Sequence, residues 1–156
     1  MLSKTEKHQY FFEVDLNWLK GREGIITAND VKDTIYVATP PEFQGGVPDK
    51  WSPEHLFLGA LCSCFMTTFL AFADKKKMTP SHFKCSAIGR IQLVEGHLEF
   101  TGIDLYPKIY LPEMEDHSAY SEVLKKTHQH CIIAHSIKAP VIYHEEILPD
   151  KHLVVS

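Results

Sequence analysis

The sequence predicts an α+β fold in which antiparallel sheets wrap around a buried central helix. Residues 52–73 form the longest apolar run of the 156-residue chain, and no residue from Leu56 to Ala73 is charged. Segments typical of strands precede and follow this run. This order of elements indicates the α+β class rather than the α/β class with a parallel sheet. The hydrophobic content of 44% is sufficient for one core. We therefore expect a single domain over residues 1–156.

Three short strands are predicted before the apolar run. Residues 9–18 alternate apolar or aromatic with polar side chains, which is typical of a half-buried strand. Glycine-bracketed residues 21–24 and the Asn29-Asp30 pair indicate turns. The two further strands are expected at 25–27 and 34–38, so the N-terminal part is an antiparallel meander, followed by a loop rich in proline and glycine over 40–48.

The apolar run has the signals of a helix. Ser52 is a suitable N-cap, Pro53 suits the first helical position and Glu54 complements the positive end of the helix dipole. The run also reaches the lower length limit of a membrane span, which is the alternative interpretation. Its glycine, serine, threonine and cysteine residues lower its hydrophobicity, so we expect a helix buried inside a globular protein.

A long hairpin and a second helix are predicted after the apolar run. Strands at 83–94 and 98–110 flank the Glu95-Gly96 turn. The second helix, 118–130, has Tyr120, Val123, Leu124 and Thr127 at helical spacing, and Pro112, Glu113, Glu115 and Asp116 come before it. The remaining expected elements are a short helical or irregular piece at 132–137 and a final strand at 141–148.

Composition and charge restrict the function classes. A formal net charge of −4 argues against a general nucleic-acid binder. The N-terminal residues show no secretory signal, so we expect a cytoplasmic protein with reduced thiols. The central helix has more apolar surface than one small sheet covers, which predicts an obligate homodimer with the two helices packed on each other.

The four cysteines are the candidates for chemistry. Cys62 and Cys64 are two positions apart on the predicted helix, about 200° around its axis, so they face nearly opposite sides. Glu54 and Cys64 are ten positions apart, within roughly 80° of each other, and can border one site. Cys62 and Cys85 are interpreted as small hydrophobic residues of the core.

The segment SPEHLFLGALCSCF resembles the helix motif of the OsmC/Ohr family (osmotically inducible protein C and organic hydroperoxide resistance protein). Gly21-Arg22-Glu23-Gly24 is similar to the arginine turn of that family, and the segment around Cys131 resembles its second cysteine segment, although Ile132 replaces the usual proline. The resemblance extends over residues 10–147 and implies an intertwined homodimer.

The resemblance implies a cysteine-based peroxidase for organic hydroperoxides. It makes Cys64 the peroxidatic cysteine, Cys131 the resolving cysteine, Arg22 the residue against the thiolate and Glu54 the carboxylate that holds this arginine. A guanidinium favours a thiolate, which is the form that attacks a peroxide. The expected partners are a hydroperoxide and a dithiol reductant, either a lipoylated or a thioredoxin-like protein; no cofactor, nucleic acid or membrane is expected.

Two other function classes remain open. His128, His130, Cys131 and His135 form a cluster that suits zinc or copper, although a helix over 118–130 places His128 and His130 on different faces. A non-catalytic protein that binds a thiol or small molecule on the same scaffold is the third class. Seven aromatic and apolar residues are candidates for a pocket near Cys64: Trp51, Phe57, Phe65, Met66, Phe69, Tyr106 and Tyr110.

Overall fold

The computed structural model describes residues 8–112 and 116–150. The chain divides into two compact units, Met1–Leu56 and Phe57–Ser156. We describe each unit by itself, and the single domain over 1–156 stays a prediction. The expected helix-opening residues Glu113 and Glu115 lie outside the described residues.

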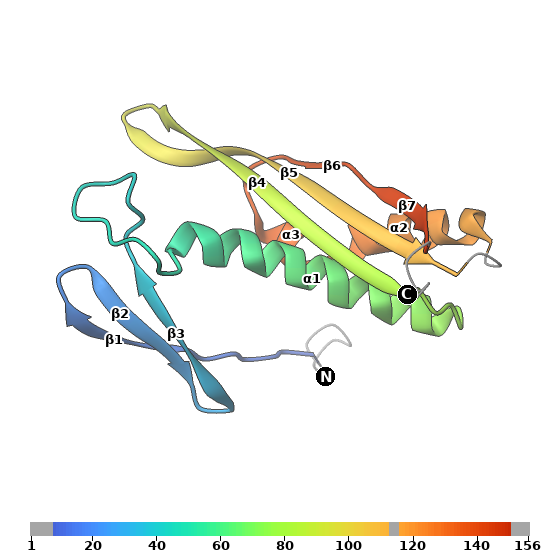
Figure 1. The fold of residues 1–156 in the computed structure, drawn as a ribbon, viewed down its shortest axis with the longest axis horizontal. Helices are drawn as coiled ribbons and strands as arrows, with labels where there is room; N and C mark the ends of the chain where they lie inside the picture. Colours follow the sequence, from blue (N-terminus) through green and yellow to red (C-terminus); the bar gives the residue numbers. More distant parts are fainter. Residues whose placement is uncertain (1–7, 113–115, 151–156) are drawn as a thin grey trace, which may run out of the picture. The chain divides into compact units, whose positions relative to one another are not determined.

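The N-terminal unit contains the predicted antiparallel meander (Figure 1). Its strands are β1 (Asp15–Lys20), β2 (Glu23–Ala28) and β3 (Val31–Ala38), hydrogen-bonded in that order. Gly21 has φ +48° in the turn between β1 and β2, a conformation that glycine adopts without steric cost. Three strands joined by two turns are therefore confirmed, with different bounds for the first strand.

The first strand starts later than predicted. Pairing of β1 with β2 begins at Asp15, opposite Thr27, and β2 ends at Ala28. No strand of the described chain pairs with residues 9–14, so their alternating pattern does not produce a strand. The prediction of a half-buried strand over 9–18 is wrong in this respect, since Phe12 is 92% exposed and Trp18 75% exposed.

Helix α1 (Pro53–Lys75) confirms the predicted central helix. The Ser52 hydroxyl accepts a hydrogen bond from the His55 backbone N–H at 3.2 Å, and its Oγ lies 2.8 Å from His55 Nδ1. Ser52 therefore caps the helix, as expected. The helix ends where Lys77 adopts φ +56°. By length and composition, α1 is the one helix in the described residues that is apolar enough to cross a membrane, a test that core helices also pass.

Burial of α1 is confined to one face in the single chain. Leu61, Phe65, Phe69 and Ala73 are completely buried, while a second row at the same four-residue spacing is exposed: Gly59, Ser63, Thr67 and Ala71. Only 22% of its most apolar window is buried. The expectation of a helix covered on most sides is therefore not met by one chain alone.

The C-terminal unit contains the predicted long hairpin. Strands β4 (His82–Val94) and β5 (His97–Leu111) pair antiparallel along their lengths (Figure 1). Glu95 and Gly96 connect them with φ values of +48° and +88°. Two positive φ values are typical of the type I′ turn that matches strand twist.

The predicted final strand 141–148 consists of two short strands. They are β6 (Val141–Tyr143) and β7 (Glu146–Pro149), and both pair parallel with β5. Between them, the side chains of His144 and Glu145 pair with Asp104 and His128. This sheet is therefore mixed rather than antiparallel, and the α+β class is confirmed.

Two helices complete the C-terminal unit. Asp116 caps α2 (His117–His130) by accepting a hydrogen bond from the Ser118 N–H at 2.8 Å. The four residues predicted to face the core are all buried: Tyr120, Val123, Leu124 and Thr127. Cys131 follows directly and precedes the short helix α3 (Ile132–Ser136), as expected for residues 132–137.

Candidate functional site

The structure brings Cys64 and Cys131 together. Cys64 is half-buried on α1, and Cys131 is completely buried between α2 and α3. Their thiols lie close enough for Cys64 to raise the pKa of Cys131. Both pack in the same core cluster of the C-terminal unit. Two cysteines that the sequence separates by a strand hairpin and a helix are therefore neighbours in the fold.

The surroundings of Cys131 keep its thiol protonated. Burial raises the pKa of Cys131 to about 11, against the lowering effect of a backbone hydrogen bond from Ala134. The hydrogen bond and the charge of Cys64 contribute to this raised value. Cys131 therefore keeps its proton at neutral pH.

A hydroxyl also borders the Cys64 sulfur. Thr68, one helical turn further along α1, has its Oγ1 4.0 Å from Cys64 Sγ. Burial raises the pKa of Tyr143, and the charge of Cys131 adds to this effect. Two hydroxyl groups therefore lie in the neighbourhood of the paired thiols.

Arg22 lies in the N-terminal unit at the turn between β1 and β2. Its carbonyl accepts a hydrogen bond from the Thr39 N–H at 3.3 Å. Its side chain lies against Gly45, where an added Cβ would be 2.9 Å from Arg22 Nε. Gly45 has φ +78°, so both its conformation and its contact with Arg22 favour glycine.

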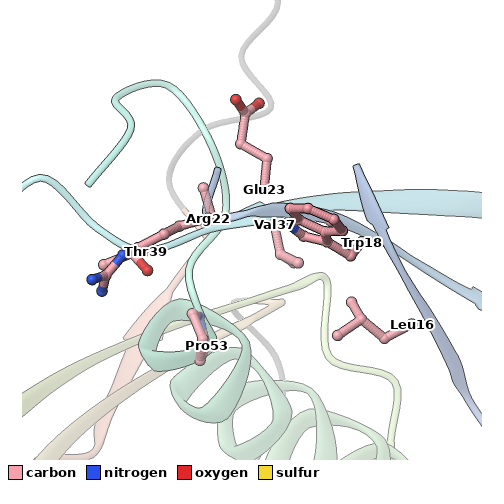
Figure 2. Close-up of a pocket in the computed structure, with 9 residues that line it drawn as sticks. Leu16, Trp18, Arg22, Glu23, Val37, Thr39 and Pro53 are labelled. Atoms are coloured by element: carbon pink, nitrogen blue, oxygen red, sulfur yellow. The ribbon is translucent and has the colours of Figure 1, made fainter. Parts of the chain in front are cut away.

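A pocket of the N-terminal unit borders Arg22. It measures about 310 Å³ and is mainly apolar. Figure 2 shows Arg22, Thr39 and Pro53 on one side of it, and Trp18 and Leu16 on the other. Trp18 is held in place by a hydrogen bond from its Nε1 to the Gly21 carbonyl at 3.0 Å. This pocket has an apolar wall beside a guanidinium.

Glu54 occupies the first turn of α1, as predicted. Within residues 8–112 and 116–150, its Oε2 is buried and accepts no hydrogen bond. A buried carboxylate oxygen without a donor is unfavourable, so this oxygen is available to a cation. No ion pair joins Glu54 to Arg22 in the described part of the chain, and the pairing of these residues stays a prediction.

The sequence interpretation missed a second pair of thiols. Cys62 on α1 and Cys85 on β4 are both half-buried, and their thiols lie close enough for each to shift the pKa of the other. Each was interpreted as a separate packing residue, because periodicity places a residue on a face but does not identify the residue opposite. The available signal was that both cysteines fall on core-facing positions of adjacent elements.

The histidines of the suggested metal cluster have separate partners. His128 pairs with Glu145 and stacks on Tyr143 with a ring separation of 4.0 Å. His130 lies against Phe72, and His135 Nε2 lies 2.8 Å from the Gln129 carbonyl. Within residues 8–112 and 116–150, no three histidine, cysteine or acidic side chains form a group suited to a metal.

Two of the residues expected to line a pocket belong to the core instead. Phe65 and Phe69 are completely buried. Phe65 packs against Tyr143, and Phe69 packs against Phe83 and Tyr120. Their contribution is therefore to packing rather than to a substrate surface.

Comparisons with known proteins agree on the family. The model of the OsmC-like protein family matches residues 46–145. The chain is 20% identical over 135 residues to the uncharacterised protein YmaD of Bacillus subtilis, which covers 85% of this chain and 89% of that protein.

Solved structures share the fold at low identity. An OsmC-like protein of unknown function from Vibrio cholerae has a TM-score of 0.79 and 19% identity, with 88% of this chain and 99% of that chain covered. An organic hydroperoxide resistance protein from Elizabethkingia anophelis has a TM-score of 0.71 and 19% identity, with coverages of 92% and 99%. OhrB of Bacillus subtilis has a TM-score of 0.64 and 18% identity, with coverages of 88% and 98%. The protein therefore belongs to the OsmC-like family.

Proposed function

We propose that the protein reduces organic hydroperoxides to alcohols with Cys64 as the peroxidatic cysteine. The observation that carries this proposal is that Cys64 and buried Cys131 lie close together in one core cluster. The family includes organic hydroperoxide resistance proteins, which supports the substrate class. Cys131 retains its proton at neutral pH and stabilises negative charge on the adjacent sulfur.

The reaction proceeds in three steps. The Cys64 thiolate attacks one peroxide oxygen, the O–O bond breaks, and the departing alkoxide takes a proton to become the alcohol. The resulting Cys64 sulfenic acid condenses with the Cys131 thiol, which forms a disulfide and releases water. An external dithiol then reduces this disulfide by thiol–disulfide exchange and becomes a disulfide itself.

Arg22 and Glu54 complete the proposed site. Arg22 places a permanent positive charge against the Cys64 thiolate, and its planar fork also offers donors to the peroxide oxygens. Glu54 holds this guanidinium through the oxygen that otherwise lacks a partner. The apolar pocket beside Arg22 supports an alkyl or fatty-acid hydroperoxide as the substrate.

The proposed partners are a lipoylated or thioredoxin-like dithiol protein and a second copy of the chain. The exposed row of Gly59, Ser63, Thr67 and Ala71 supports the dimer, because small side chains allow a second helix to approach closely. We place the dimer in the cytoplasm, where reductants keep thiols free. A monomeric mass in light scattering would contradict the dimer.

Mass spectrometry of the peroxide-treated protein tests the central claim. We expect one equivalent of tert-butyl hydroperoxide to convert the reduced protein into a form with Cys64 linked to Cys131. A loss of two hydrogens at this pair, together with release of one equivalent of alcohol, supports the proposal. Peroxide consumption distinguishes it from a non-catalytic binding protein on the same scaffold, which would leave the hydroperoxide unchanged.

A further inference from the structure

The second thiol pair lies where α1 packs on β4. Leu58 and Phe69 bracket Cys62 on one face of α1, because positions 58, 62 and 69 fall within a narrow arc at about 100° per residue. Phe83 and Gly89 bracket Cys85 on the core-facing side of β4, whose burial alternates along the strand. These facing rows enclose the two cysteines.

Two contacts fix the alignment of these rows. A Cβ on Gly89 would lie 3.1 Å from Leu58 Cδ2, so the Leu58 side chain packs against the strand at that end. The rings of Phe69 and Phe83 are 5.5 Å apart at the other end. Cys62 and Cys85 lie between these contacts in both segments, which agrees with the mutual effect of their thiols on each other's pKa.

The pKa values of the two thiols are shifted in opposite directions. A hydrogen bond from Cys85 lowers the pKa of Cys62, although burial opposes this effect. The same hydrogen bond raises the pKa of Cys85 far above its usual range, and burial and the charges of Cys62 and Cys131 add to the increase. Cys62 is therefore the nucleophilic member, and Cys85 is the donor that stays protonated.

We propose that Cys62 and Cys85 form a second redox pair, which exchanges with small-molecule disulfides and closes a disulfide between α1 and β4. The Cys62 thiolate attacks one sulfur of the small disulfide and displaces the other as a thiolate. The Cys85 thiol, losing its proton, then attacks Cys62 in the mixed disulfide and displaces the second thiolate. The protein loses two electrons and two protons, and the small disulfide becomes two thiols.

This pair is distinct from the proposed peroxidase pair. Positions 62 and 64 are about 200° apart along the chain direction, which is about 160° the shorter way around the helix axis. Their side chains therefore lie on opposite flanks of α1. Cys62 contacts a strand residue, whereas Cys64 contacts the residue between α2 and α3. The inference therefore goes beyond the proposed function and does not depend on hydroperoxide turnover.

The test uses a variant that lacks the peroxidase thiols, Cys64→Ser with Cys131→Ser. The reduced full chain is equilibrated with defined ratios of reduced and oxidised glutathione, without peroxide, and free thiols are blocked at low pH. Peptide mass spectrometry then maps the linkages. We expect a Cys62–Cys85 disulfide whose fraction rises with the share of oxidised glutathione, in this variant and in the wild type. Free Cys62 and Cys85 at every ratio would overturn the proposal.

A single-thiol control separates exchange from simple surface modification. In Cys85→Ala, the mixed disulfide of Cys62 with glutathione has no resolving thiol, so we expect it to accumulate at ratios where the wild type shows the internal disulfide. The assignment of Cys62 as the nucleophile is tested while both thiols are present, in reduced Cys64→Ser/Cys131→Ser. We expect a limiting amount of iodoacetamide to alkylate Cys62 at least about tenfold faster than Cys85, because the thiolate of Cys85 is scarce beside Cys62. Equal alkylation of the two thiols in peptide mapping would contradict this assignment.

Discussion

The two flanks of α1 carry one cysteine each, and the two cysteines have different neighbours. Cys64 faces completely buried Cys131, which receives a backbone hydrogen bond from Ala134. Cys62 faces Cys85, which is only half-buried on a strand. In both pairs, the pKa of one thiol is raised, that of Cys131 mainly by burial and that of Cys85 mainly by Cys62. The difference shows that the element opposite each helix face, rather than the spacing of the two cysteines, determines the partner of each thiol.

The largest expected effect is on the rate of hydroperoxide reduction, which we expect to depend on the cysteine of one flank of α1 and not on that of the other. Cys64→Ser removes the proposed nucleophile, so we expect reduction of tert-butyl hydroperoxide to fall by at least about a hundredfold. The matched control Cys62→Ser is expected to keep the rate within about twofold. The measurement is hydroperoxide consumption with dithiothreitol as reductant. Equal rates for Cys64→Ser and wild type would refute the proposed role of Cys64. A loss of hydroperoxide reduction only in Cys62→Ser would show that Cys62 is the peroxidatic cysteine.

The next largest expected effect is on the lifetime of the Cys64 sulfenic acid when the proposed resolving cysteine, Cys131, is replaced. In Cys131→Ser, the Cys64 sulfenic acid has no thiol to condense with, so we expect it to accumulate and to proceed to sulfinic acid with excess peroxide. Cys85→Ser should show neither product at Cys64. Trapping with dimedone and mass spectrometry measure both species. A Cys64 sulfenic acid that is equally short-lived in Cys131→Ser would show that another group resolves it.

Arg22 is expected to act on the Cys64 flank alone. Arg22→Lys keeps the positive charge but loses the planar fork, so we expect hydroperoxide reduction to fall by about tenfold. Alkylation of Cys62 by iodoacetamide, followed by peptide mapping, should keep its wild-type rate. A parallel loss of reactivity at both cysteines would indicate a general structural effect and not a contact with the thiolate.

The packing on the Cys62 flank predicts a stability effect. A Cβ at Gly89 would lie 2.5 Å from Phe100 Cε1 and 3.1 Å from Leu58 Cδ2. We expect Gly89→Ala to lower the free energy of unfolding by about 1–3 kcal/mol. The same change at Gly59, where nothing lies within 4 Å in the single chain, adds no clash inside one copy, so a loss of stability there would report the proposed contact between two copies. Urea unfolding followed by circular dichroism compares the two variants.

The smallest expected effect concerns alkaline pH. Burial raises the pKa of Cys131 from 9.0 to about 11 in the folded protein. The unfolded chain therefore releases this proton first, so the contribution of Cys131 to stability is complete below pH 9 and is lost as pH rises through 11. We expect Cys131→Ala to flatten the decline of the melting temperature between these values. An unchanged decline would show that Cys131 titrates alike in both states.

Local signals in the sequence determined most of the regular elements. Ser52 and Pro53 predicted the start of α1, because capping depends on residues within one helical turn. The Glu95-Gly96 pair predicted the hairpin turn, and the spacing of Tyr120, Val123, Leu124 and Thr127 identified the buried face of α2. Residues 9–14 show the limit of such signals, since an alternating pattern forms a strand only where a neighbouring strand supplies hydrogen bonds.

The sequence by itself thus determined the central helix, the long hairpin, the second helix and the family motif around Cys64. Only the tertiary structure decided that β6 and β7 run parallel to β5, because strand direction depends on the path of the chain between strands. It also decided which thiols meet. Cys62 with Cys85 and Cys64 with Cys131 are distant in sequence, and their contacts arise from the packing of α1 between β4 on one flank and the α2–α3 junction on the other. Periodicity assigns a residue to a face, whereas the partner of that face is set by long-range packing.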